Sequence, residues 1–270
     1  MEEVEFSRNE IGKIKVSKER QGMDNILIPS DIKDKVKKAV RFFWSTREGQ
    51  ISKQLENEVR DQGNRGAATG GKQLNGFLDL IKEILIENEI SEHVIFTNSK
   101  LELPGYYRPS KKWDLLVIDE GHLALAIELK SQVEPSFGNN FNNRTEEAMG
   151  SALDVWTAFR EGVFKNSNPW LGYLMMLEDC SSSSAPVSVR SPHFNVMKEF
   201  EDSSYIKRYE IFCNKLILER QYNATCLITS QRSDSQTGDF NIPDENLSFD
   251  KFLISMLSSV FAYRATKGKV

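Results

Sequence analysis

The chain has 270 residues, 39% hydrophobic and 27% charged, which is the composition of an ordinary globular protein. Its net charge of −4 excludes a surface that is basic all over, but leaves room for one basic cleft on an acidic body. No apolar run approaches the ~20 residues of a membrane-spanning helix, and the charged amino terminus is not that of a secretory signal. Three cysteines without metal-ligand spacing indicate reduced thiols, so we expect a cytoplasmic protein with no membrane partner.

The first part of the chain predicts an extension, a helix, a loop and a second helix. Residues 1–30 are charged and weakly patterned, and 31–44 predict a helix with a basic face and an aromatic end. A glycine-rich loop at 62–73 precedes a helix over 74–85, where apolar residues recur at helical spacing. The loop nearly matches a phosphate-binding P-loop, but Gln73 stands where that motif needs serine or threonine. No apolar strand precedes it either, so we exclude nucleotide hydrolysis.

The rest of the chain alternates between predicted strands and helices. In order, we expect a strand at 93–97, a hairpin of 113–118 and 123–130, a loop at 131–143, a helix at 144–161 with the apolar stripe Met149, Ala152, Leu153, Trp156 and Phe159, a strand at 170–177, a loop at 181–184, a helix at 204–220, a strand at 224–230 and a helix at 249–263. This order favours an α/β fold with a mixed central β-sheet flanked by helices. We assign 1–45 to an N-terminal arm and helix, and 46–270 to a single domain.

The hairpin carries the strongest chemical signal in the chain. Its strands are apolar, with Asp114 at the outer end of the first strand, Glu128 at the outer end of the second and Lys130 two places further on. Side chains alternate along a strand, so Glu128 and Lys130 share one face. A turn centred on Gly121 would pair position 118 with 124, 116 with 126, and 114 with 128. The two carboxylates would then flank one point.

Two carboxylates and a lysine at one point are suited to phosphodiester hydrolysis. Asp114, Glu128 and the Leu129 carbonyl are oxygen ligands of the kind Mg²⁺ prefers, and the metal would stabilise the phosphate and help to deprotonate water. Lys130 would position the attacking water and offset developing charge. The alternative is an exposed cross-strand pair of Glu128 and Lys130, worth a few tenths of a kcal/mol. The three-residue pattern alone leaves both interpretations open.

Longer strings around these residues are more specific. The strings 103–114 and 128–150, with shorter blocks at 157–162, 177–180 and 191–194, closely resemble the XhoI/PaeR7I family of type II restriction endonucleases. The resemblance implies a PD-(D/E)xK restriction-endonuclease-like core in which Asp114, Glu128 and Lys130 are the catalytic acids and lysine. Trp113 stands where the motif name has proline.

The resemblance also implies what the enzyme acts on. It implies an Mg²⁺-dependent homodimer that cuts double-stranded DNA at the palindrome CTCGAG after the first C, leaving a 5′ overhang. The expected setting is a prokaryotic cytoplasm that also holds a cognate DNA methyltransferase. The resemblance identifies the catalytic residues better than the residues that recognise the DNA sequence, because related endonucleases with the same catalytic core read different sites. The alternatives are a catalytically silent DNA-binding module and a DNA-repair nuclease on the same fold.

Polar residues near the hairpin are candidates for DNA contact. Asparagine amides can contact adenine edges, and arginine can contact guanine or phosphate, although asparagine is also common in turns and helix caps. We expect at least one DNA contact from the segment after the lysine strand: Asn139, Asn140, Asn142, Asn143 and Arg144. Ahead of the first acid, we expect Arg108, Lys111 and Lys112 to follow phosphates, the alternative being solvated loop charge.

Two further pairs of residues receive weaker assignments. Glu146 flanks the apolar stripe of the following helix, so it is the acid that we expect to reach the metal site, whereas Glu147 should point away. Tyr106 and Tyr107 could pack against a sugar-phosphate backbone, but core packing is the favoured interpretation.

Overall fold

The structure is a computed structural model that describes residues 26–58, 72–165 and 168–267. Most of the extension expected at 1–30 and of the glycine-rich loop expected at 62–73 lies outside these residues. Within the described parts of the chain, no helix is long and apolar enough to cross a membrane.

Five strands of the described chain form a mixed sheet in the order β1-β4-β5-β6-β7. Their bounds are β1 Ile95–Phe96, β4 Leu115–Asp119, β5 His122–Gln132, β6 Trp170–Glu178 and β7 Ala224–Ser230. The β1, β4 and β5 strands pair antiparallel, whereas β5, β6 and β7 run parallel. Every residue of β6 is buried, which confirms that its apolar run is a central strand covered on both faces.

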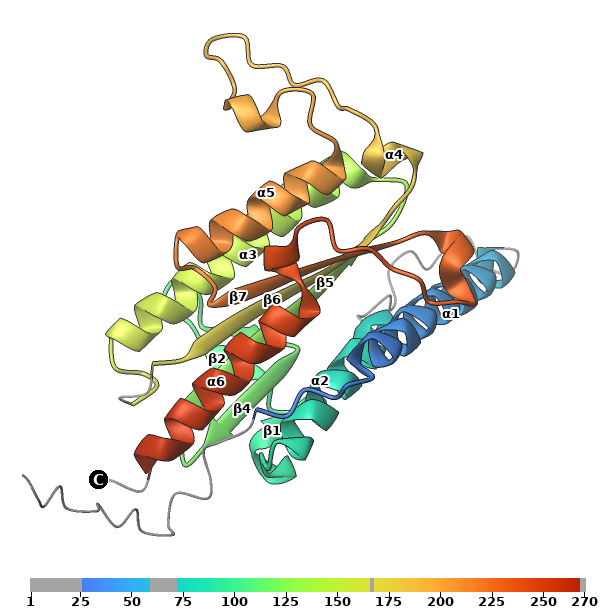
Figure 1. Cartoon of the computed structure of the whole chain (residues 1–270). Helices are drawn as coiled ribbons and strands as arrows, with labels where there is room; N and C mark the ends of the chain where they lie inside the picture. The colour runs from blue at the N-terminus through green and yellow to red at the C-terminus, as the bar shows by residue number, and fades with distance from the viewer. Residues whose placement is uncertain (1–25, 59–71, 166–167, 268–270) are drawn as a thin grey trace, which may run out of the picture.

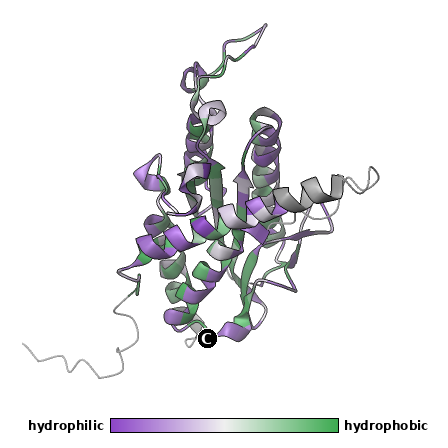
Figure 2. Cartoon of the chain, turned by 90° about the vertical axis from the view of Figure 1, so that its right-hand side faces the viewer, coloured by the Kyte–Doolittle hydropathy of each residue, from purple (hydrophilic) through white to green (hydrophobic). Residues whose placement is uncertain are grey.

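Helices cover both faces of the sheet, and Figure 1 shows this layered arrangement. One layer holds α1 Ile32–Glu58, α2 Asn75–Glu87 and α6 Phe249–Lys267, and the other holds α3 Phe137–Arg160 and α5 Tyr205–Leu218. Two apolar clusters fill the spaces between the layers, and Figure 2 shows the apolar residues gathered on the strands. The predicted α/β class, with a mixed central sheet flanked by helices, is confirmed.

The first helix is longer than predicted. Residues 31–44 were expected to be helical, but α1 continues to Glu58. Its side chains Val40, Phe43 and Trp44 are at most 1% exposed and belong to the same apolar cluster as α2. The division proposed at residue 45 therefore falls inside a helix that packs in the main core, and the division itself stays a prediction.

The hairpin of β4 and β5 keeps the predicted register at its acidic end. Leu116 pairs with Ala126 as expected, but a bulge beyond Val117 makes residue 118 face 123 instead of 124. The extra residue is Ala124, which joins the apolar cluster on the face opposite to Ala126. Because the bulge lies between the turn and this pair, it leaves the register at Asp114 and Glu128 unchanged.

A second, smaller ribbon was not predicted. Strands β2 Glu102–Pro104 and β3 Ser110–Lys112 pair antiparallel just before β4. Each has three residues, and most of their side chains are exposed, so they lack the apolar alternation by which a strand is recognised. Their importance is positional, because β3 delivers a lysine to the acidic end of the hairpin.

The loop predicted at 131–143 is wrong. β5 continues to Gln132 and α3 begins at Phe137, so the asparagine-rich segment forms the first turns of a helix. Asparagine is a poor helix former, but aromatic packing outweighs that preference here. The ring of Phe137 stacks on Tyr205 with centroids 5.6 Å apart, and Phe141 meets Tyr209 edge-on at 5.0 Å.

The apolar stripe predicted for α3 is wrong in part, because Ala152 is buried and Trp156 and Phe159 pack against the core, but two of its residues do not. Met149 and Leu153 are 44% and 48% exposed, whereas the buried side of the helix is built largely from small residues, namely Ala148, Ser151, Ala152, Val155 and Ala158. Small side chains let the helix approach the sheet closely, so the larger apolar residues are not needed at the contact. The buried face is rotated relative to the predicted one, which changes which acid turns toward the hairpin.

One connection projects from the molecule. The serine tract predicted as a loop is a single helical turn, α4 Ser181–Ser184, and an extended segment then leaves the body before returning to α5 (Figure 1). Ser204 caps α5, because its hydroxyl accepts a hydrogen bond from the Lys207 N–H at 3.2 Å.

Candidate active site

Asp114 lies immediately before β4 and is held by the neighbouring strand. Its backbone N–H donates to the Ile127 carbonyl at 3.2 Å, and its Oδ2 accepts from the Leu129 N–H at 2.7 Å. Burial raises the pKa of the Asp114 carboxyl above its usual value, although the Leu129 N–H and the Lys130 ammonium oppose the rise. Asp114 also lines a cleft, so its carboxyl group is available to a ligand there.

Glu128 is the most deeply buried charge of the site, at 1% exposure. Its Oε1 lies 2.8 Å from the Lys130 ammonium and 3.1 Å from that of Lys111. Burial alone would raise the pKa of Glu128, but the two ammonium groups outweigh it and hold the pKa below its usual range. The Tyr222 hydroxyl shares its proton between Glu128 Oε2, at 3.4 Å, and the Ala148 carbonyl, at 3.1 Å.

Lys130 faces acids on two elements. Besides its contact with Glu128, its ammonium lies 3.7 Å from Glu147 Oε2 on α3. Burial alone would lower the pKa of Lys130, but the surrounding carboxylates raise it, so the side chain stays protonated at neutral pH. A permanently charged lysine suits electrostatic stabilisation of a phosphate better than proton abstraction.

Glu147 rather than Glu146 reaches this group, which reverses the expectation. Glu147 contacts Lys130 and also accepts a hydrogen bond from Arg144 Nη1 at 2.8 Å. The error follows from the misplaced apolar stripe, because the buried face of α3 is centred on Ala148 and Ala152. Glu147 therefore lies on the edge of α3 that faces the end of β5.

Lys111, predicted to follow DNA phosphates, lies inside the acidic cluster. Its side chain is only 14% exposed, and its ammonium sits 4.1 Å from the centre of the Trp113 ring as well as beside Glu128. Burial lowers the pKa of Lys111, with Glu128 opposing the change. This placement depends on the β2–β3 ribbon, which the sequence pattern did not indicate.

Asp154 of α3 holds the loop between β2 and β3 by hydrogen bonds. The Asp154 carboxylate accepts from the backbone N–H groups of Tyr106 and Tyr107 at 2.5 and 2.8 Å, and from Arg108 Nε at 2.7 Å. A side chain at Gly105 would collide with that carboxylate. The tyrosines are 56% and 67% exposed, so the core packing favoured for them is wrong.

The remaining candidates for DNA contact are divided between two sides of α3. Asn140 and Arg144 line the cleft beside Lys130, whereas Asn139, Asn142 and Asn143 are exposed elsewhere on the first turns of the helix. Lys112 is exposed and pairs across the ribbon with Glu102. Whether these residues contact DNA stays a prediction.

The cleft has a volume of about 400 Å³ and mostly polar walls. Its lining comes from α1, the turn before α2, β4–β5 and α3: Arg47, Gln73, Leu74, Asp114, Leu129, Lys130, Ser131, Gln132, Val133, Glu134, Pro135, Ser136, Asn140 and Arg144. Arg47 and Gln73 were not singled out as site residues. Each is distant in sequence from the hairpin, so only the packing of α1 and α2 against the sheet brings them to it.

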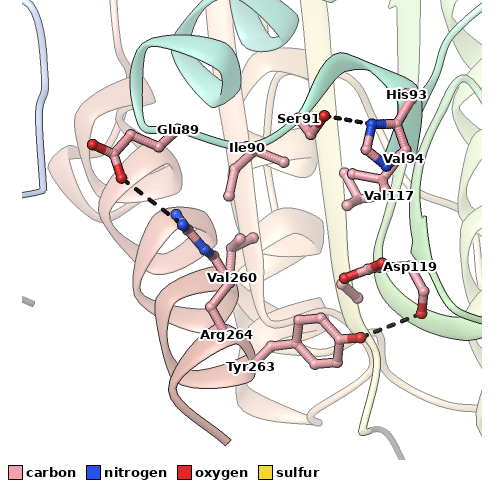
Figure 3. Close-up of a pocket in the computed structure, with 11 residues that line it drawn as sticks. Glu89, Ile90, Ser91, His93, Val94, Val117, Asp119, Val260, Tyr263 and Arg264 are labelled. Carbon is pink, nitrogen blue, oxygen red and sulfur yellow. Dashed lines mark hydrogen bonds and ion pairs between the residues drawn. The ribbon is translucent and has the colours of Figure 1, made fainter. Parts of the chain in front are cut away.

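A second hollow, of about 290 Å³, lies at the turn end of the hairpin (Figure 3). Several of its polar groups satisfy one another: Ser91 bonds to His93, Arg264 lies 3.8 Å from Glu89, and the Tyr263 hydroxyl donates to the Asp119 carbonyl at 3.3 Å. No lysine lines it. It therefore lacks the combination of acids and lysine that phosphodiester hydrolysis requires.

The acidic end of the hairpin offers hard oxygen ligands for a divalent metal ion. Among the described residues, no group of three or more histidine, cysteine, aspartate or glutamate side chains is placed to hold an ion. An ion here would take Asp114, Glu128, the Leu129 carbonyl and water, a set that suits a cation which keeps several waters. The buried Asp114 carboxyl, whose pKa is raised, would gain a counter-charge from such an ion.

Comparison with known proteins places this site in a functional class. The family model described as restriction endonuclease XhoI matches residues 53–242. The type II restriction enzyme BstVI of Geobacillus stearothermophilus is 53% identical over 207 residues, covering 74% of this chain and 92% of its own. The type II restriction enzymes XhoI of Xanthomonas vasicola and AbrI of Azospirillum brasilense are 48% and 47% identical, over 67% and 61% of this chain and 73% and 75% of their own. No solved structure matches the chain.

The fold, the hairpin site and these matches define a site-specific deoxyribonuclease, an endonuclease that binds and hydrolyses DNA. Within that class, the chain belongs to the XhoI family of type II restriction endonucleases. Enzymes of this kind generally use a divalent metal ion.

Proposed function

We propose that this enzyme is an Mg²⁺-dependent restriction endonuclease that cuts duplex DNA at CTCGAG after the first C and leaves a 5′ overhang. The observation that carries the chemistry is the buried Glu128 carboxylate held by Lys130 beside Asp114. The proposed recognition sequence in the DNA comes from the family resemblance, and the 48% sequence identity to the enzyme XhoI supports it.

The side chains have distinct roles in this proposal. Asp114, Glu128 and the Leu129 carbonyl would hold the metal, which would supply charge neutralisation at the phosphate and a water of lowered pKa. Lys111 and Lys130 both contact Glu128 Oε1, so both ammonium groups would stay beside this ligand carboxylate. Lys130 would orient the attacking water or offset charge on a phosphate oxygen.

A palindromic site implies a symmetric enzyme. Two copies related by a two-fold axis would place one hairpin site on each strand, so we propose a homodimer in which each subunit cuts one strand. Such an activity requires protection of the host's own DNA. We therefore propose a partnership in function with a cognate DNA methyltransferase in a prokaryotic cytoplasm.

Plasmid DNA that carries a single CTCGAG tests the proposal. Incubation with the protein and Mg²⁺ should give one linear product, and sequencing its ends should place the cut after the first C. A plasmid with that site altered by one base is the control and should stay intact. Discrete cutting at a different sequence would overturn only the assigned site. No cutting of any DNA would favour a silent binding module, and cleavage of branched DNA alone would favour a repair nuclease.

A further inference from the structure

One wall of the cleft is formed by a residue outside the matched family region. Arg47 lies on α1, before residue 53 where the family match begins, and it lines the same cleft as Arg144 of α3. The α1 helix reaches this position because Phe43 and Trp44 anchor it in the core, and the Trp44 indole donates to Ser230 Oγ at the end of β7 at 3.1 Å. Arg47 is thus held over the same cleft that Asp114 and Lys130 line.

The charges near Arg47 do not balance. Glu178, 3% exposed at the end of β6, accepts from the Glu134 N–H at 2.9 Å and lies 3.4 Å from the Arg232 guanidinium. Arg47 therefore shares one carboxylate with a second guanidinium. Burial lowers the pKa of Arg47, and repulsion from Arg232 adds to the effect, while Glu178 opposes it. The side chains that line the whole cleft include three cations, Arg47, Lys130 and Arg144, and two acids, Asp114 and Glu134.

Three buried polar atoms of the cleft have no hydrogen-bond partner among the described residues: Arg47 Nε, Gln73 Oε1 and Arg144 Nε. Buried polar atoms of folded proteins are usually satisfied, so a group of orphans that line one cleft indicates a ligand that completes them. Gln73 is only 7% exposed, and its amide nitrogen donates to Ser131 Oγ at 3.3 Å. If the amide is turned over, its oxygen accepts from the Ser131 hydroxyl and its nitrogen faces the cleft as a third donor.

We propose that Arg47, Gln73 and Arg144, which line the cleft together, bind a backbone phosphate of the DNA beside the one that is cleaved. This inference rests on the proposed function and adds a second phosphate site to it. Two guanidinium forks and an amide provide planar, directional donors that match phosphate oxygens. The contact carries no sequence information, so it supplies affinity and register rather than recognition.

The test measures binding of a CTCGAG duplex and of a scrambled duplex by fluorescence anisotropy, in Ca²⁺ to prevent cleavage, over a range of KCl concentrations. Arg47→Ala should weaken binding to both duplexes about tenfold or more, and should reduce the slope of log affinity against log salt by about 0.9 per subunit. Arg47→Lys keeps the charge without the fork, so it should retain much of the slope and only part of the affinity. Lys38→Ala is the matched control, because Lys38 is an exposed cation on the same helix that does not line the cleft.

Each other outcome has a definite meaning. Unchanged affinity and slope in Arg47→Ala, with an unchanged unfolding midpoint, would overturn the proposal. A loss confined to the CTCGAG duplex would also overturn it, because that would be a base contact. Competition by inorganic phosphate without any effect of Arg47→Ala on DNA binding would assign the site to free anions. If the wild-type protein bound neither duplex, the proposed function would be wrong as well. If Arg47→Ala bound DNA with normal affinity and cut it specifically, only the inference about the phosphate site would be wrong.

Discussion

At the scale of single residues, the Glu128 carboxylate is the centre of the charged group in the candidate active site. A carboxylate that is 1% exposed would ordinarily be neutral, yet ammonium groups from β3 and β5 keep it ionised. Lys111 and Lys130 balance the carboxylates of Glu128 and Asp114, so the hairpin end holds two charges of each sign. Such a balanced group lets the buried acids stay ionised beside a polar cleft.

Lys130→Ala separates binding from chemistry. Among the described residues, the Lys130 ammonium contacts the carboxylates of Glu128 and Glu147, whose charges already balance it, so its loss should leave specific DNA binding in Ca²⁺ nearly unchanged. Loss of one stabilising donor lowers such rates by about 10²–10³-fold, and loss of water positioning adds to it, so single-turnover cleavage in Mg²⁺ should fall by at least that much. Lys38→Ala should cut at the wild-type rate. Near-normal cutting by Lys130→Ala would remove the residue from the mechanism.

Sequence pattern located part of this site and missed the rest for a physical reason. Asp114, Glu128 and Lys130 lie on one hairpin, where local strand pairing sets their spacing, so alternation and register were sufficient to bring them together. Lys111 arrives through a ribbon without apolar alternation, and Arg47 and Gln73 arrive through helix packing. Contacts of that kind depend on the tertiary fold and leave no local signal.

At the scale of secondary-structure elements, Asp154 fastens the β2–β3 loop to α3. Burial alone would raise the pKa of Asp154, but the donors of residues 106–108 hold it below its usual range. A carboxyl group whose pKa is lower in the folded protein than in the unfolded chain stabilises the fold. The whole contribution is present above the pKa of the unfolded chain, about 4, and it is lost as the pH falls through the pKa of the folded protein.

Asp154→Asn should therefore destabilise the protein by about 1–3 kcal/mol at pH 7, because it replaces a charged acceptor of three donors. The difference from wild type should shrink below about pH 4. Urea unfolding at a series of pH values measures both effects, and Asp79→Asn on the exposed side of α2 is the control. A difference that stayed constant down to pH 3 would show that the Asp154 charge does not hold the loop.

The start of α3 shows packing overriding local preference. Periodic apolar patterns predicted β6, β7 and α5 well, because each buries a continuous face. The asparagine-rich start of α3 has no such pattern, and it is helical because two aromatic residues four positions apart pack on α5. The helix in turn presents Asn140 and Arg144 to the cleft.

Phe137→Ala should unwind this first part of α3. Removing a buried phenylalanine costs about 3–5 kcal/mol, and without it the asparagines lose the contact that holds them helical. Hydrogen exchange should show faster amide exchange at 140–144, and DNA binding in Ca²⁺ should weaken. Met149→Ala, an exposed position on the same helix, should change stability by no more than about 0.5 kcal/mol. Protected amides at 140–144 in Phe137→Ala would show that the helix start does not need the stack.

At the scale of the whole molecule, both sides of the cleft depend on helices that lie far apart in the chain. The α1 and α2 helices close one side of the sheet, and α3 and α5 close the other (Figure 1). The hairpin site sits where these layers meet the ends of the parallel strands. Its geometry is therefore a property of the complete core rather than of the hairpin alone.

Truncation tests whether the first helix is a separable addition. A chain that starts at residue 46 loses Phe43 and Trp44, both at most 1% exposed in the main core. Burial of two such aromatic side chains is worth about 6–10 kcal/mol, which is comparable with the total stability of about 5–15 kcal/mol of a typical protein. We expect the 46–270 chain to lose cooperative urea unfolding and cleavage together, whereas a chain that starts at residue 26 keeps both. A 46–270 chain that unfolds cooperatively and still cuts DNA would support a domain boundary at 45, and would show that the first half of α1 is not needed for the fold.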